Sequence, residues 1–201
     1  MTNYNRYYNH ELYDKVHNYL SSKENKPSTP SHVSFLGFQY FDLPPAPKHK
    51  YDEVHPRIFL GDGVVAQDKD QLTSMGITHL VNCCEGTKFN QVNTNQAYYD
   101  DINVKYHGIQ AQDVAAFRIC DHFEAAVNFI DDALKEETSK LYIHCQMGVS
   151  RSSTIVIAYL MAKKGMDLMH AVKHVRHRRE IFPNSGFLKQ LCDLNKNIYG
   201  E

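Results

Sequence analysis

The sequence lacks three features that would each have placed it in a broad class of protein. Its 201 residues carry 22 Lys and Arg against 23 Asp and Glu, and a net charge of −1 gives no overall attraction to nucleic acid or acidic membranes. The longest strongly apolar run, TIVIAYLMA, is too short to cross a bilayer, and the amino terminus has no apolar stretch of secretory type. Five irregularly spaced cysteines do not suit a disulfide framework, so we expect a reducing compartment, the cytosol or the nucleus.

Residues 1–49 differ in composition from the rest, and we expect them to form an N-terminal extension. Leu12, Val16 and Tyr19 recur at helical spacing, which predicts a short amphipathic helix near residues 9–20. The stretch SSKENKPSTPS then predicts a polar linker, and DLPPAPKHK predicts an extended connector. The extension carries no recognisable docking module for a mitogen-activated kinase. Its pattern leaves open whether it docks on the core, covers a site, mediates dimerisation or has no fixed structure.

Residues 50–199 alternate between strand and helix patterns. The short segments RIFLG, THLVNC, VKYHGI and KLYIHC are rich in apolar, β-branched or aromatic residues, which predicts strands. Apolar side chains at helical spacing predict three buried helix faces: Phe123, Val127, Ile130 and Leu134; Leu168, Val172 and Val175; and Leu188, Leu191, Leu194 and Ile198. Such alternation favours an α/β domain with a mainly parallel sheet, in which ligands bind beyond the carboxyl ends of the strands.

The stretch HCQMGVSR begins at such a strand end. Cys145 ends a predicted strand and a helix begins near Ser150 or Arg151, so the chain between them must turn tightly at Gly148. Consecutive N–H groups in a turn of this kind form an anion site, with the positive end of a helix behind it. Arg151 adds a planar set of donors for two phosphate oxygens, and the same positive field lowers the pKa of a thiol.

We therefore expect Cys145 not to be buried like an inert core cysteine, but to be an ionised nucleophile on the floor of a phosphate site. The predicted phosphate-binding residues are Gln146, Met147, Gly148, Val149, Ser150 and Arg151. Ser152 is expected to donate a hydrogen bond to the sulfur and ease its departure, and His144 to support the loop from the opposite face.

Other readings of the cysteine are an inert thiol, a metal ligand and a redox thiol. Zinc sites use several Cys and His residues at fixed spacing, and His144 with Cys145 has no matching second pair, so we expect no metal. His170, His174 and His177 have ligand-like spacing on a helix, but no Asp/Glu motif accompanies them, which favours solvated histidines.

HCQMGVSRSST matches the His-Cys-x5-Arg-Ser/Thr signature, and the chain thereby resembles the protein tyrosine phosphatase superfamily. PRIFLGDGVVAQD, LTSMGITHLVNCCEG, VNTNQAYYDD, AYLMAKKGMDL and REIFPNSGFLKQL are similar to the small dual-specificity phosphatases of the atypical, VHR-like (vaccinia H1-related) group. The resemblance extends over about residues 51–198. It implies a five-stranded, mainly parallel sheet flanked by helices, and a dephosphorylation of phosphotyrosine and phosphoserine/phosphothreonine in two steps, without metal or cofactor, through a phosphocysteine.

The resemblance also implies a general acid at Asp113, which follows a strand and begins a loop 32 residues before Cys145. The alternative is a solvated loop residue or a helix N-cap. Asp100 and Asp101 precede the strand VKYHGI and are therefore placed at the wrong edge of the sheet.

Three more residues are assigned by resemblance. Asn184 is implied to support the phosphate loop, although it and Ser185 equally suit the cap of the last helix. Phe89 is implied to wall the substrate pocket. Arg179 is implied to lie beside it and to meet a second phosphate, although HVRHRRE also suits a solvated helix face. The sequence has no aromatic-clamp loop, so a shallow site is expected, and Met147 replaces an acidic residue of the namesake.

Three competing functions belong to other classes. A lipid phosphatase would carry lysines in the loop, and an RNA triphosphatase would have Asn before the arginine; CQMGVSR has neither. A silent phosphobinding module or scaffold stays open, although Cys145, Arg151 and Asp113 occur together.

The expected partners are phosphorylated proteins, including doubly phosphorylated ones such as kinase activation loops, with no nucleic acid and no membrane. A monomer and a homodimer are equally compatible. Cys84, at a neighbouring strand end, is a candidate for a reversible disulfide with Cys145, although small packed thiols are the simpler reading of Cys83 and Cys84.

Overall fold

The computed structural model describes residues 9–22 and 47–200, so the predicted linker after Ser22 and most of the predicted connector lie outside the described residues. Five strands form one sheet in the order β1-β2-β5-β3-β4. They are β1 Tyr51–His55, β2 Ile58–Gly61, β3 His79–Asn82, β4 Lys105–Gly108 and β5 Leu141–His144. β1 pairs antiparallel with β2, and the other neighbouring pairs are parallel, which confirms the expected mainly parallel sheet.

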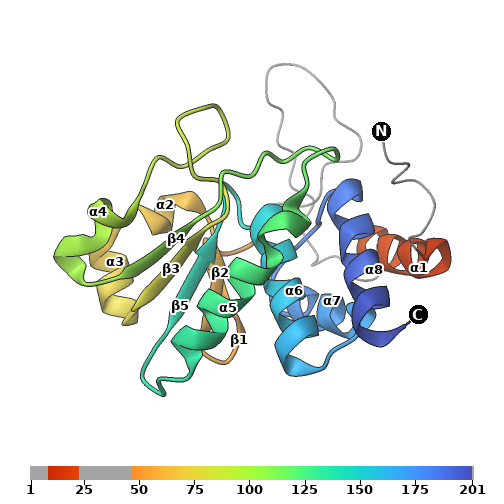
Figure 1. Cartoon of the computed structure of the whole chain (residues 1–201). Coiled ribbons are helices and arrows are strands. Elements are labelled where there is room, and N and C mark those ends of the chain that lie inside the picture. The colour runs from red at the N-terminus through yellow and green to blue at the C-terminus, as the bar shows by residue number, and fades with distance from the viewer. Residues whose placement is uncertain (1–8, 23–46, 201) are drawn as a thin grey trace.

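Helices cover both faces of the sheet (Figure 1). One face packs against α2 Gly63–Ala66, α3 Lys69–Met75 and α4 Gln96–Tyr99, and the other against α5 Phe123–Leu134, α6 Arg151–Lys164, α7 Leu168–Arg176 and α8 Ser185–Tyr199. Short 3₁₀ turns occur at Asp100–Ile102 and Ile119–His122. Strand alternation divides β5 between the two faces, because Leu141 and Ile143 join the core under α5 to α8 while Tyr142 joins the core under α2 and α3.

The residues of the three predicted helix faces are buried or half-buried, except for Ile198 at the end of α8. Leu168, Val172 and Val175 are fully buried. Leu188 and Leu191 are fully buried too, while Leu134 and Leu194 are half-buried against the same core. The prediction for Ile198 is wrong, since its side chain is 40% exposed in the last turn of α8. Among the described residues, no helix combines the length and the apolar character needed to span a membrane.

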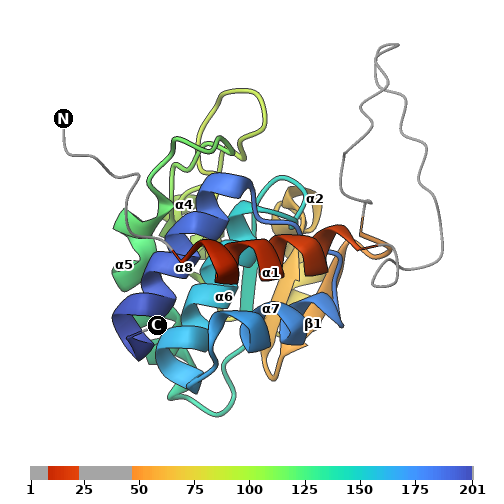
Figure 2. The same cartoon turned by 90° about the vertical axis from the view of Figure 1, so that its right-hand side faces the viewer.

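The predicted N-terminal helix is present as α1, His10–Ser21. Asn9 caps it, since its side-chain oxygen accepts a hydrogen bond from the Leu12 N–H at 3.0 Å. Val16 and Leu20 are buried in the same core as α5 to α8, and α1 lies across α7 and α8 (Figure 2). Each buried side chain of this size removes enough apolar surface from water to stabilise the docked helix by about 1.5–3 kcal/mol.

The carboxyl ends of the four parallel strands lie in one row. The register pairs His144 with both Gly61 and Asn82, and Asn82 with Gly108. The segments that leave these four residues therefore meet at one edge of the sheet, where a doubly covered parallel sheet binds its ligands.

Candidate active site

The segment between β5 and α6 forms a tight loop from Cys145 to Ser150. Gly148 has φ of +67°, and a Cβ at this position would lie 2.4 Å from the carbonyl oxygen of Gly61, so the turn requires glycine. Arg179 fixes the loop from behind, because its Nε donates to the Gly148 carbonyl at 2.9 Å and its Nη2 to the Met147 carbonyl at 3.0 Å.

Cys145 lies under this loop and is only 2% exposed, so the expectation that it is not buried is wrong. The residue packs into the core that also holds α5 to α8, while its sulfur accepts a hydrogen bond from Ser152 Oγ at 3.2 Å. Burial raises the pKa of the Cys145 thiol. The charge of Arg151, the Ser152 hydroxyl and the N–H groups of Ser152 and Val149 outweigh burial and lower this pKa below its ordinary value.

Arg151 is also buried, at 2% exposure, and is held by two other loops of the site. Its Nη1 donates to the carbonyl oxygens of Asn90 at 2.8 Å and Ala111 at 3.2 Å. Its Nε lies 3.5 Å from Asp113 Oδ2 and has no hydrogen-bond partner among the described residues. The guanidinium group is therefore fixed in position with a donor free for an anion.

Asp113 receives two hydrogen bonds on the same carboxylate oxygen. Ser150 Oγ donates to its Oδ1 at 2.7 Å, and Asn184 Nδ2 donates to the same atom at 2.8 Å. The loop of Asp113 rests directly on the start of α8, where a Cβ at Gly186 would lie 1.9 Å from the Ala115 carbonyl oxygen. These contacts hold the carboxylate beside the phosphate loop and leave Oδ2 toward Arg151.

Asn184 both caps α8 and braces the site. Its Oδ1 accepts from the Phe187 N–H at 3.0 Å, and its own N–H donates to Ser150 Oγ at 3.1 Å. The two alternatives from the sequence, cap or brace, are thus not exclusive. The side-chain amide binds Asp113, and the phosphate loop is reached through Ser150.

His144 supports the loop from the strand. It is fully buried, and its Nδ1 lies 3.1 Å from the Cys145 carbonyl oxygen. Burial lowers the pKa of His144 to about 4, so the ring is neutral at neutral pH and can donate from Nδ1.

Of the two residues assigned to the substrate pocket by resemblance, the structure buries Arg179 and exposes Phe89. Arg179 is 3% exposed, and its Nη1 donates to Asp52 Oδ2 at 2.8 Å and to the His49 carbonyl at 3.0 Å. This correction has a physical reason, because a carboxylate on β1 and loop carbonyls already occupy the guanidinium nitrogens. Phe89 is 96% exposed, so its ring lies in solvent, and its place at the wall of the pocket stays a prediction.

The candidates that the sequence disfavoured, Asp101 and the histidines of α7, lie away from Cys145, Arg151 and Asp113. Asp101 pairs with Lys69 at 2.7 Å, at the start of β4 and so at the opposite edge of the sheet from Asp113. His170 lies 2.6 Å from Asp167 and His174 lies 3.2 Å from His55. Among the residues that the structure describes, no group of three or more His, Cys, Asp or Glu side chains could hold a metal ion.

Cys84 is buried and its thiol is free. Burial raises the pKa of Cys84 to about 12, and the Cys145 sulfur contributes in the same direction. The proposed disulfide between Cys84 and Cys145 stays a prediction.

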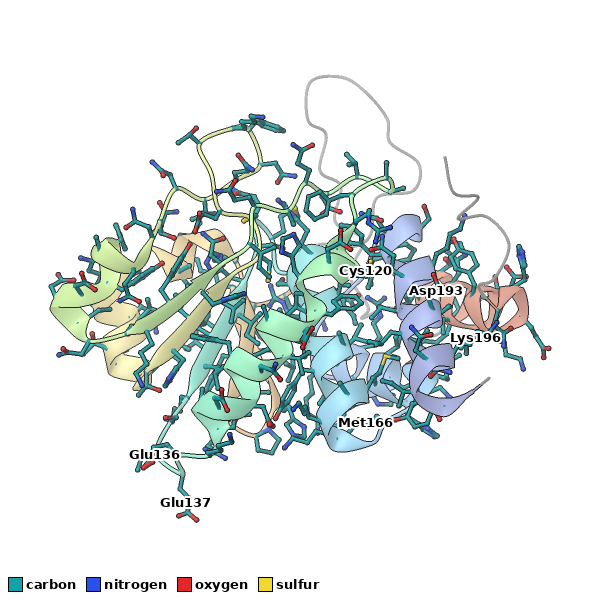
Figure 3. All side chains as sticks on the ribbon, in the orientation of Figure 1. Cys120, Glu136, Glu137, Met166, Asp193 and Lys196 are labelled. Atoms are coloured by element: carbon teal, nitrogen blue, oxygen red, sulfur yellow. The ribbon has the colours of Figure 1, made fainter. Side chains whose placement is uncertain are left out.

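A cavity of about 890 Å³ lies beside the site without containing it. It separates α5 from α8, and its lining includes Ala115 of the Asp113 loop and the two residues Cys120 and Asp193 labelled in Figure 3. Cys145, Arg151 and Asp113 are not part of its lining, so the cavity is not the reaction centre.

Sequence reasoning missed two positioning residues. Asp52 clamps Arg179, and no local pattern in YDEVH marks it for this role. Asn82 folds the loop after β3, since its Nδ2 donates at 3.0 Å to both the Val92 carbonyl and Thr94 Oγ1. A polar residue that ends an apolar strand in THLVNC was the available signal for Asn82.

Comparisons with known proteins agree with this geometry. Residues 58–197 match the family model described as dual specificity phosphatase, catalytic domain. The chain is 45% identical over 150 residues to dual specificity protein phosphatase 13B of Mus musculus, an alignment that covers 75% of each protein. The crystal structure of human DUSP28 matches with a TM-score of 0.63 and 25% identity, covering 74% of this chain and 95% of that one. Human tyrosine phosphatase-like serine/threonine/tyrosine-interacting protein matches with a TM-score of 0.60 and 29% identity, covering 75% of this chain and 98% of that one.

Proposed function

The chain belongs to the dual specificity phosphatase family, and from this premise we propose that Cys145 is the nucleophile, Arg151 the phosphate-binding residue and Asp113 the general acid and base. The protein is a dual specificity protein phosphatase that acts on phosphorylated proteins. The cluster of Ser152, Cys145, Arg151 and Asp113 is the observation that supports these roles. It is joined by the hydrogen bond from Ser152 to Cys145 and the 3.5 Å ion pair of Arg151 with Asp113.

In the first step the Cys145 thiolate attacks phosphorus. An S–P bond forms as the P–O bond to the substrate breaks, and the electron pair of that bond goes to the leaving oxygen. The Nε of Arg151 and the N–H groups of residues 146–151 bind the non-bridging oxygens and stabilise their charge. Asp113 gives its proton to the leaving oxygen. Because Ser150 and Asn184 both donate to Oδ1, the proton is carried on Oδ2.

In the second step water attacks the phosphocysteine, and Asp113 accepts a proton from it. The S–P bond breaks and the sulfur leaves as a thiolate. The Ser152 hydroxyl, 3.2 Å from the sulfur, stabilises the thiolate and so makes it a better leaving group. Asn184 acts as a positioning residue for Asp113, and His144 for the loop.

The exposure of Phe89 supports a shallow site that admits both phosphotyrosine and phosphoserine or phosphothreonine. Arg179, which was assigned to a second phosphate, is buried and bonded to Asp52. We therefore propose that the site recognises a single phosphorylated residue. We place the activity in a reducing compartment, cytosol or nucleus, because a thiolate nucleophile is lost on oxidation.

The test is phosphate release from phosphotyrosine and phosphothreonine peptides, with chelator and reductant present. The wild type should turn over, Cys145→Ser should not, and Asp113→Asn should lose about 10²- to 10⁴-fold in kcat. Asp101→Asn, which removes an exposed carboxylate at the far edge of the sheet, should retain wild-type activity. Turnover by Cys145→Ser would show that the nucleophile is another residue.

A further inference from the structure

Four exposed apolar side chains come from the segments that follow the parallel strands, at the edge of the sheet that holds the phosphate loop. Six large hydrophobic side chains are exposed in the described part of the chain: Val64, Phe89, Val114, Met147, Ile198 and Tyr199. The last two end α8, and the first four come from the four segments that follow the parallel strands. The exposed fractions of these four range from 50% for Val114 to 96% for Phe89.

Met147 belongs to the phosphate loop, and Val64 lies next to a residue that bonds the loop backbone. Met147 is part of the loop and is 54% exposed. Val64 follows Gly63, whose N–H donates to the Gln146 carbonyl at 3.2 Å. A Cβ at Gly63 would lie 3.4 Å from the Cys145 carbonyl oxygen, so α2 begins in contact with the loop and directs Val64 into solvent beside it.

The other two neighbour residues that bind the site directly. Phe89 precedes Asn90, whose carbonyl accepts from Arg151 at 2.8 Å. Val114 follows Asp113, whose carboxylate accepts from Ser150. Each of the four side chains is thus in the loop, or adjacent in the chain to a residue that bonds the loop or Arg151.

The polar groups beside these side chains are two neutral amides, a capping carboxylate and two exposed lysines, Lys50 and Lys88. Lys50 lies beside the start of α2, because its carbonyl accepts from the Asp62 N–H at 3.0 Å. Gln112 and Gln146 are exposed and neutral, and the Asp62 carboxylate accepts from the Val64 and Val65 N–H groups. Lys88 is the exposed cation of the Phe89 loop, and Arg179 is buried. Four large apolar side chains are therefore exposed on the segments that form the edge of the sheet where the phosphate binds.

We propose that this apolar mouth, formed by Val64, Phe89, Val114 and Met147, binds the residues that flank the phosphorylated residue of a protein substrate and selects apolar side chains there. The proposal rests on the proposed function, which places the substrate phosphate over Cys145 and so brings the flanking chain onto these four side chains. An extended chain advances about 3.3–3.6 Å per residue, so the contacts fall within roughly three residues on either side of the phosphate.

The experiment compares two phosphotyrosine peptides of equal length and net charge, one with Leu and Val at the flanking positions and one with Ser and Asn. The readout is the ratio of their kcat/KM values, each divided by kcat/KM for a small aryl phosphate. The same ratio is measured without turnover, as Kd values of the Cys145→Ser variant. We expect the apolar peptide to be favoured about tenfold or more, since each buried aliphatic group contributes to affinity.

Val64→Thr, Val114→Thr and Phe89→Ser should each lower this ratio by about threefold or more. Ile198→Thr is the matched control, because it changes an apolar residue of 40% exposure on α8, outside the mouth, and should leave the ratio unchanged.

Equal kcat/KM and Kd values for the two peptides would overturn the proposal, while turnover of the aryl phosphate would leave the proposed function standing. Absence of aryl phosphate turnover together with a Kd ratio that favours the apolar peptide would overturn the proposed function and leave the apolar mouth standing. A wild-type dimer that Phe89→Ser converts to a monomer, with no change in the ratio, would assign the mouth to a second copy of the chain and overturn the proposal.

Discussion

Replacing Arg179 separates a structural role from the substrate-binding role that the sequence suggested. In the structure the guanidinium group donates to the carbonyls of Gly148, Met147 and His49 and to the carboxylate of Asp52. Its side chain is 1% exposed. Arg179→Met keeps the length of the side chain but removes every one of these donors.

The expected loss of stability follows from those contacts. Removing one partner of a buried ion pair costs about 3–5 kcal/mol, because the other charge stays buried. Asp52 is 17% exposed and keeps His49 Nδ1 at 2.9 Å, which favours the lower end of the range. We expect the free energy of unfolding to fall by about 3 kcal/mol and, for a chain of this size, Tm to fall by roughly 6–12 °C.

The assay combines thermal unfolding with kcat/KM for singly and doubly phosphorylated peptides. Both peptides should lose activity by the same factor, because the phosphate loop is loosened for every substrate. Arg178→Met is the control, because Arg178 is exposed and its side chain donates to the His174 carbonyl at the surface. The Tm of this variant should change little. An unchanged Tm for Arg179→Met together with a selective loss on the doubly phosphorylated peptide would refute the reasoning.

Three further predictions address the thiol, the N-terminal helix and the second cysteine. Ser152→Ala should raise the apparent pKa of Cys145, measured by the pH dependence of iodoacetamide alkylation, whereas Ser153→Ala should not, because its hydroxyl binds the Val149 and Ser150 carbonyls instead. Leu20→Ala should lower the free energy of unfolding in urea by about 2–5 kcal/mol, and a change below about 1 kcal/mol would contradict the docking of α1 on the core. After peroxide treatment, added thiol should restore less phosphatase activity to Cys84→Ser than to the wild type, because the variant cannot protect Cys145 in a disulfide. Full recovery of activity by the variant would exclude a Cys84–Cys145 disulfide.

Sequence patterns predicted four of the five strands, since β2, β3, β4 and β5 lie within the predicted segments. β2, β3 and β5 are interior strands, and strands covered on both faces require continuous apolar residues. β4 is an edge strand with no buried residue, and the β-branched and aromatic residues of VKYHGI were its signal. β1 was not found from its residues. Only Val54 of its five residues is fully buried, as expected for a strand at the edge of a sheet, so YDEVH carries no alternation to detect.

The local chemistry of the site could be predicted, and the partners that orient it could not. Strand, cysteine, glycine turn and arginine follow one another in the chain, so their geometry is set by local backbone rules. Asp52 reaches Arg179 across 127 positions, and Asn90 reaches Arg151 across 61. Such contacts depend on the tertiary fold. For the same reason neither the resemblance, which placed Arg179 beside the pocket, nor the charge pattern of HVRHRRE showed that the folded chain buries it.

The phosphate loop is held from two sides by groups that are themselves fixed elsewhere. Arg179 and Asp52 tie it to the edge strand, and Ser150 ties it to Asp113 and to the cap of α8. The Phe182 N–H adds a bond to the Val149 carbonyl at 2.9 Å, and the ring of Phe182 meets His17 of α1 at 6.0 Å. Because α1 shares one core with the helices around the site, its contact with Phe182 makes the N-terminal helix part of the support of the loop.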